Sequence, residues 1–294
     1  MGIRGWFSGR KSGVSVSQEM PVPQPAERRF ATGAAVFDLA ATEQLRTLFA
    51  VDPATRDQAW YDRFWNAAWT AALVVPDPPV FTGPDGMAYL RLELPGDAAA
   101  FEANSLMNVA GSMVEQGVGA ALFASADVTA DEPAYVMSMG VLDSILRFDC
   151  PDGEPFEIAE ALEPPPADQI ETRVAGVAER STLKAGQEIL VGTPSEQYLS
   201  VPAARALYRH LVEGWGMADP RVALIVVPAM RPTRSLVIGK SVAEFLREGV
   251  DEALMAERVR MLSWYLPPSR RLMLMPDDWS AEDMTRLADL CGSR

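Results

Sequence analysis

The stretch of sequence that most constrains the fold is residues 187–239, in which short apolar runs are separated by prolines and glycines. Residues 188–191 predict a strand, and Gly192 and Pro194 end it because both residue types interrupt regular structure. Ser200 then occupies the N-cap position of a predicted helix, where its hydroxyl can accept a hydrogen bond from a free backbone amide. A strand, a turn and a helix are therefore expected in that order.

Two further strand candidates follow this helix. Residues 221–228 and 235–239 are apolar, rich in β-branched residues and bounded by prolines, and both runs are too short for good helices. The helix itself has one apolar face, which consists of Leu207, Tyr208, Leu211, Val212 and Trp215. The order strand, helix, strand, strand indicates a sheet with a helix packed on it.

The rest of the chain mixes helix and strand patterns in a similar way. Helices are expected within residues 34–50, from a capping box at Thr55–Gln58 onward, and at 101–116, 242–265 (with a break at Gly249) and 280–291. Strands are expected at 73–75, 80–81, 87–94, 120–124, 135–139, 144–148 and 272–275. We therefore predict an α+β or α/β fold of two mixed-sheet domains with helices packed on the sheets.

Composition divides the chain into four parts. The proline run at 164–166 cannot continue a helix or pair in a central strand, so it marks a linker. We expect a disordered basic tail at 1–33, an N-terminal domain at 34–163, a linker at 164–180 and a C-terminal domain at 181–294. The acidic residues between 127 and 171 are expected at a solvated edge, and a docking surface for a basic partner is the alternative.

Charge and cysteine content exclude several classes of protein. The formal net charge of −14 argues against nucleic-acid binding, which needs a basic surface. The two cysteines lie far apart in the sequence, so neither a disulfide framework nor a zinc site is indicated, and a reducing cytoplasm fits best. Trp6 and Phe7 lie among basic residues in the tail; we interpret this segment as a simple tail, and contact with a membrane surface is the alternative.

The chain offers little for catalysis. Its one histidine, His210, is expected to be a partly exposed structural residue, and it leaves no second imidazole for a two-histidine metal site. The sequence Gly239-Lys240-Ser241 resembles the end of a phosphate-binding loop, but the upstream glycine that such a loop requires is missing. No catalytic residue, cofactor or metal is predicted.

Two arginines are the best candidates for a binding site. Arg231 and Arg234 flank Pro232 between two predicted strands, and a guanidinium group can bind a carboxylate or another anion through two hydrogen bonds. A solvated turn is the simpler alternative. Gly192 and Glu196, on the turn after the first strand of this region, complete the set of candidate binding residues.

Two regions resemble a known family. Ala50-Val-Asp-Pro-Ala-Thr-Arg-Asp-Gln-Ala-Trp-Tyr61, with the aromatic helix and Ala-Leu-Val-Val-Pro76 after it, is similar to the opening of SseB-family N-terminal domains. Gly186-Gln-Glu-Ile-Leu-Val-Gly-Thr-Pro-Ser-Glu196 and Asp219-Pro-Arg-Val-Ala-Leu-Ile-Val-Val227 resemble the C-terminal domain of that family, which is linked to enhanced serine sensitivity in bacteria. The resemblance implies a two-domain protein without an established catalytic residue.

These observations lead to one main expectation about function. We expect a non-catalytic cytosolic protein that binds another protein, with a homo-oligomer left open. The alternative is an enzyme of unfamiliar type that uses carboxylates together with Arg231 or Arg234 in a cleft between the domains.

Overall fold

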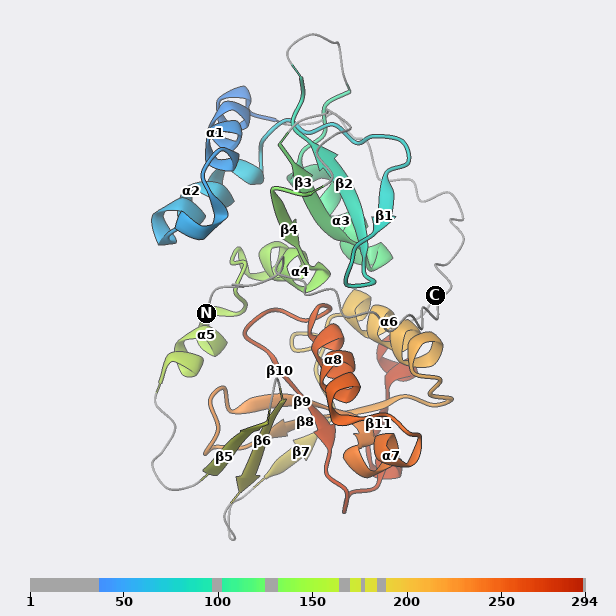
Figure 1. Ribbon diagram of the computed structural model, residues 1–294. Coiled ribbons are helices and arrows are strands. Elements are labelled where there is room, and N and C mark those ends of the chain that lie inside the picture. The colour runs from blue at the N-terminus through green and yellow to red at the C-terminus, as the bar shows by residue number, and fades with distance from the viewer. Residues whose placement is uncertain are drawn as a thin grey trace.

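The structure, a computed structural model, describes residues 37–96, 102–124, 132–163, 170–175, 178–183 and 189–292 (Figure 1). Trp6, Phe7 and the rest of the predicted tail lie outside these ranges. The described residues form eight α-helices, a four-stranded mixed sheet and a five-stranded mixed sheet, which confirms the predicted fold class. None of these helices is both long and apolar enough to cross a membrane.

The first sheet has the strand order β1-β2-β3-β4. Its strands are β1 (Val80–Thr82), β2 (Ala88–Glu93), β3 (Gly119–Phe123) and β4 (Tyr135–Met137). β1 and β2 form an antiparallel hairpin, β2 and β3 are parallel, and β3 and β4 are antiparallel. The parallel pair requires a crossover connection, which α3 (Leu106–Gln116) provides.

The second sheet has the order β10-β9-β8-β11, and β7 also pairs with β8. Its strands are β7 (Leu190–Gly192), β8 (Arg221–Val226), β9 (Arg234–Ser241), β10 (Arg271–Met275) and β11 (Thr285–Arg286). β9 and β10 are parallel and are joined through α7 (Val242–Arg247) and α8 (Glu252–Ser263). The predicted order strand, helix, strand, strand corresponds to β7, α6 (Val201–Arg209), β8 and β9.

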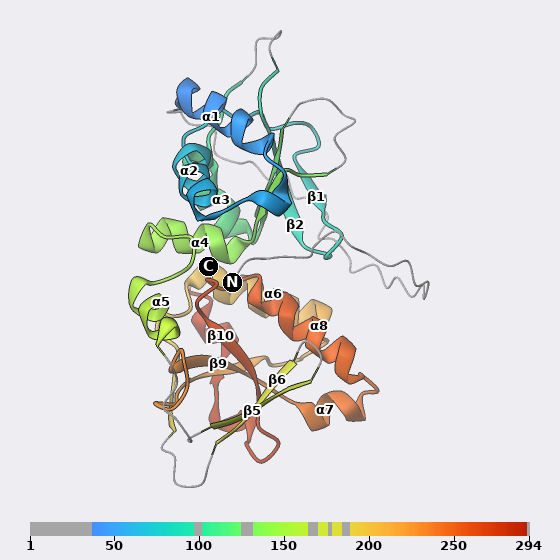
Figure 2. The ribbon, with the colours of Figure 1, turned by 60° about the vertical axis from the view of Figure 1, so that its left-hand side comes forward.

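Helices and a shared apolar core join the two sheets. Figures 1 and 2 show the first sheet above the second, with α4 (Met139–Phe148), α6 and α8 between them. One cluster of buried side chains extends from Ala41 to Leu287 and includes residues from both sheets. The aromatic helix α2 (Gln58–Ala68) contributes Trp60 and Phe64 to this core, as its pattern predicts. α1 (Leu39–Phe49) packs beside α2.

Several local expectations were wrong. Residues 144–148 belong to α4, because Ser138 caps a helix that continues through this apolar run. The capping box at Thr55–Gln58 does not form, since Asp57 is the N-cap of α2 and accepts from the Trp60 amide. Beyond Ser280 the chain forms two 3₁₀ turns, Ala281–Asp283 and Leu287–Leu290, on either side of β11, so the expected last α-helix is absent.

Part of the range predicted as a linker forms strands. β5 (Ile170–Ala175) and β6 (Ala178–Leu183) form an antiparallel pair. Most residues of these two strands lie within 164–180, the range predicted as a linker. α5 (Pro155–Leu162), at the end of the predicted N-terminal domain, makes its side-chain contacts with residues of the second half of the chain. By its side-chain contacts, α5 therefore packs with the second half of the chain.

Candidate functional site

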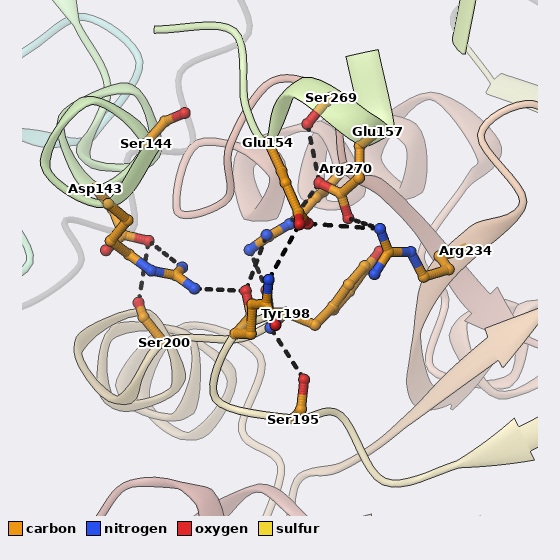
Figure 3. A network of polar contacts seen from close by, with 12 residues as sticks. Asp143, Ser144, Glu154, Glu157, Ser195, Tyr198, Ser200, Arg234, Ser269 and Arg270 are labelled. Atoms are coloured by element: carbon orange, nitrogen blue, oxygen red, sulfur yellow. Dashed lines mark hydrogen bonds and ion pairs between the residues drawn. The ribbon is translucent and has the colours of Figure 1, made fainter. Parts of the chain in front are cut away.

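Charged side chains gather where the two halves of the chain meet (Figure 3). We call this group the junction network. It draws on α4, α5, the turn before α6, the start of β9 and the loop before β10. Its members are Asp143, Arg147, Glu154, Glu157, Gln197, Tyr198, Ser200, Arg234, Ser269 and Arg270.

The centre of the junction network is a buried ion pair between Glu157 and Arg270. The Arg270 Nε lies 3.1 Å from the Glu157 Oε2, and the two side chains are only 1–2% exposed. The Ser269 hydroxyl donates to the same carboxylate oxygen at 3.2 Å. The other Arg270 nitrogens donate to the backbone carbonyls of Gln197 and Tyr198. Burial lowers the pKa of Arg270, and the facing Glu157 carboxylate opposes that shift.

Arg234 joins the other side of the same carboxylate. Its Nη2 atom lies 3.3 Å from the Glu157 Oε1 and 3.5 Å from a Glu154 oxygen. The guanidinium also lies over the rings of Phe156 and Tyr198, at 5.6 and 5.7 Å from their centroids. Arg234 therefore holds the first turn of α5 against the second sheet.

A second pair in the junction network fixes α4 to the turn before α6. The Arg147 Nη1 lies 3.1 Å from Asp143 on the same helix, and Arg147 also donates to the backbone carbonyls of Glu196 and Gln197. The Ser200 hydroxyl, which caps α6, donates to Asp143 at 3.1 Å. Asp143 and Glu157 were expected at a solvated edge, but they are buried because distant parts of the chain supply their partners.

Tyr198 occupies the middle of the junction network and is almost completely buried. The Arg270 guanidinium stacks 4.7 Å from its ring centroid. Burial and the nearby Glu157 raise the pKa of the Tyr198 hydroxyl, so this hydroxyl stays protonated at neutral pH. It has no hydrogen-bond partner among the described residues. The ring therefore acts as a packing surface for cations.

The local sequence explains how α5 faces this network. Glu154 is the N-cap residue of α5 and Pro155 occupies its first position, where the missing amide hydrogen costs nothing. Glu154, Glu157 and Glu160 recur every three residues and so share one side of the helix. Glu160 accepts from the Thr233 hydroxyl at 2.7 Å and from its amide at 3.0 Å. The glutamate side of α5 is thus its inner side.

The outer side of α5 is apolar. Phe156 is 63% exposed and Leu162 is 82% exposed. Ala159, which lies opposite Glu157 on the helix, is also exposed. A surface helix of a globular protein normally has the reverse arrangement, with its apolar stripe on the core and its charges in water. α5 is therefore inverted in polarity. Although the Arg234 guanidinium lies 5.6 Å from the Phe156 ring centroid, most of the surface of Phe156 and Leu162 stays exposed within the described part of the chain.

The four sequence-predicted binding residues have different settings. The Arg231 Nε lies 3.4 Å from Glu163, and the Arg231 Nη1 donates to the carbonyls of Pro228 and Met230. Arg234 faces Glu154 and Glu157. Glu196 offers only its backbone carbonyl to Arg147, and Gly192 ends the exposed strand β7. Both arginines therefore serve to attach residues 154–163, and carboxylates of this chain already occupy the guanidinium groups.

His210 differs from its expected setting. It is buried, because Ala203 and Ala206, which precede it by seven and four residues, widen the buried face of α6. Its Nδ1 lies 3.1 Å from the Tyr265 hydroxyl, which in turn lies 3.7 Å from the Met87 Sδ. Burial lowers the pKa of His210 to about 4, and nearby Arg258 contributes. At neutral pH this histidine is uncharged, and it supports Tyr265, whose hydroxyl contacts Met87 of the first half.

The described residues contain no group of three or more His, Cys, Asp or Glu side chains that could hold a metal ion. The carboxylates of the junction network face arginines, which would repel a cation. Sequence patterns did not single out Glu157, Tyr198 or Arg270, because each has its partners far away along the chain. The only local signal was the three-residue glutamate spacing within α5.

No protein-family model, no curated protein and no solved structure matches this chain.

Proposed function

We propose that this protein is non-catalytic and binds another protein through the outer side of α5. The observation that carries this proposal is the inverted polarity of α5, in which Glu157 is buried while Phe156 and Leu162 face solvent. Exposing large apolar side chains on a helix costs free energy in water, and such surfaces mark interaction sites. The junction network holds α5 in this orientation.

The setting of the polar residues supports a binding role. The carboxylates and arginines that could serve acid or base chemistry are occupied with one another, and His210 is buried and uncharged. The alternative of an enzyme that uses Arg231 or Arg234 gains no support from these contacts. The family resemblance to SseB-like proteins remains a hypothesis, and it fits a two-sheet protein without catalytic residues. We place the protein in the cytoplasm on the basis of its cysteine spacing.

Site-specific photo-cross-linking in the source cells tests this proposal. A photoreactive amino acid replaces Leu162 in the full-length protein, and a control protein carries it at Leu246, an exposed leucine of α7. We expect a discrete cross-linked protein from position 162 that is absent from position 246. Mass spectrometry then identifies the partner.

A second substitution checks that the contact depends on the apolar surface. Phe156→Ser in the cross-linking protein should reduce the yield of that adduct, because it removes a large part of the exposed apolar area. Equal cross-linking from both positions, or no adduct at position 162, contradicts the proposal.

A further inference from the structure

We infer that the partner segment is an amphipathic helix with one apolar side flanked by lysine or arginine. This inference rests on the proposed function of α5, because it names what the same surface binds. Three features of the structure support it: the backbone of α5, the shape of its outer side and the charges in the loop that leads into it.

The backbone of α5 favours a helical partner over an extended one. An extended peptide adds to a protein by pairing with the free edge of a sheet. α5 is a helix whose amides and carbonyls bond within its own turns, so it offers side chains only. A partner must therefore present a side-chain surface of its own, as a helix with one apolar side does.

The shape of the outer side also suits a helix. Ala159 lies between Phe156 and Leu162 on this side, so a small residue separates two large ones. Packed helices approach to about 8–10 Å between axes when ridges of side chains enter grooves, and a small residue provides such a groove. A leucine of the partner would fill the space over Ala159 between the two larger side chains.

The charges around α5 determine the sign of the flanking residues. Asp149 and Asp152, in the loop that leads into α5, are exposed and have no ion pair within the described ranges. The nearby cations are already paired, Arg231 with Glu163 and Arg234 with Glu154 and Glu157. Among the described residues, the unpaired charges in the loop before α5 are therefore negative, and the whole chain has a formal net charge of −14. Such a surface attracts a basic helix and repels an anionic lipid surface.

Two designed peptides test the inference with the full-length protein. Both carry a fluorescein label and have leucines spaced so that they share one side of the helix. One peptide has lysine at all of the remaining positions, and the other has glutamate there. Fluorescence anisotropy should show that the lysine peptide binds at least about tenfold more tightly than the glutamate peptide. Binding should weaken as salt rises, because the aspartates are exposed to solvent.

Matched variants separate specific binding from general attraction to an acidic protein. Leu162→Ser removes apolar area without changing the charge, and we expect it to weaken lysine-peptide binding by about tenfold. Leu246→Ser on α7 is the control and should leave the dissociation constant within about twofold. The double substitution Asp149→Asn with Asp152→Asn should reduce the preference for lysine over glutamate.

The outcomes distinguish this inference from the proposed function. If position 162 gives an adduct in cells but Leu162→Ser leaves the dissociation constant of the lysine peptide unchanged, the inference of a basic helical partner is overturned and the protein-binding role remains intact. Equal binding of the two peptides has the same meaning. Sedimentation with phosphatidylserine vesicles that depends on Leu162 overturns the inference in favour of a lipid surface. Absence of both the adduct and the peptide binding overturns both proposals.

Discussion

His210 shows how strongly the surroundings of one residue control its chemistry. The imidazole is buried against Tyr265, and a consistent arrangement has its Nδ1–H donating to the Tyr265 hydroxyl, whose own proton points to Met87. Water cannot easily solvate a charged imidazole there, so the pKa falls to about 4 from an ordinary value near 6.5. The only histidine of the chain is therefore a structural group.

This setting predicts a pH dependence of stability. In the unfolded chain His210 binds a proton below pH ~6.5, whereas in the folded protein it does so only near pH 4. The contribution of neutral His210 to stability is therefore complete above pH ~6.5 and declines as the pH falls toward 4. Between pH 7 and pH 4.5 we expect a loss of roughly 2–3 kcal/mol from this residue, measurable by urea denaturation.

A substitution isolates the histidine from the many carboxylates that titrate in the same range. His210→Gln should be less stable at pH 7, because the buried link to Tyr265 is altered, but its stability should fall less steeply toward pH 4.5. Parallel pH profiles of the free energy of unfolding for the two proteins would show that His210 does not titrate as inferred.

The Glu157–Arg270 ion pair is a second feature at the scale of single residues. A buried ion pair gains little net stability, because the free energy of removing both charges from water offsets their attraction. Its loss is nevertheless costly, about 3–5 kcal/mol, since the remaining charge is left buried without a partner. The pair therefore acts chiefly to fix how α5 is oriented.

At the scale of elements, α4 approaches the second half of the chain very closely. Gly140, in the first turn of α4, donates its amide hydrogen to the Trp264 carbonyl at 3.0 Å. A Cβ atom at this position would lie 1.9 Å from the Leu266 carbonyl oxygen, a backbone atom that cannot move aside freely. Glycine is needed here for space, since the helix could not otherwise contact the loop after α8.

We expect Gly140→Ala to destabilise the protein by about 1–3 kcal/mol or more, because α4 must move away from residues 264–266. Gly111→Ala in α3 is the matched control. Gly111 is exposed and a Cβ atom there would meet nothing within 4 Å, so alanine should stabilise α3 by about 0.5–1 kcal/mol. Thermal unfolding followed by circular dichroism measures both, and a neutral Gly140→Ala would contradict the close contact.

Several elements were predictable because their signals are local. Ser200, with Pro202 after it, marks the start of α6, and Gly117 in the left-handed conformation ends α3. The prediction of a strand at residues 144–148 was wrong, because an apolar run of this length fits a buried strand or a buried helix equally well. The inverted α5 could not be recognised, since its pattern alone predicts that Phe156 faces the core.

At the scale of the whole molecule, the two sheets share one core. The Trp264 Nε1 donates to the Tyr89 hydroxyl at 2.9 Å, and the two rings pack edge to face. α3 packs against α6, and Arg205 of α6 lies 3.1 Å from Glu115 of α3. Apolar side chains of both halves belong to the same buried cluster. The halves therefore stabilise each other.

We expect the full-length protein to unfold in a single cooperative transition. Separating the halves would expose the shared apolar core and break the Trp264–Tyr89 and Ser200–Asp143 hydrogen bonds. Differential scanning calorimetry should give one peak whose calorimetric enthalpy equals the van't Hoff enthalpy. Two resolved peaks would show that the sheets are independent domains joined by a linker, as composition alone suggests.

The sequence by itself determined the fold class and those elements that have local signals, because caps, turns and apolar periodicity act over a few neighbouring residues. It also indicated which chemistry to exclude, since a chain with one histidine cannot build a two-histidine metal site. Only the tertiary structure decided which charges are buried, how α5 is turned and whether the halves are separate. Each of these depends on contacts between residues about 60 to 175 positions apart, such as Ser200 with Asp143 and Trp264 with Tyr89, and no local pattern records them.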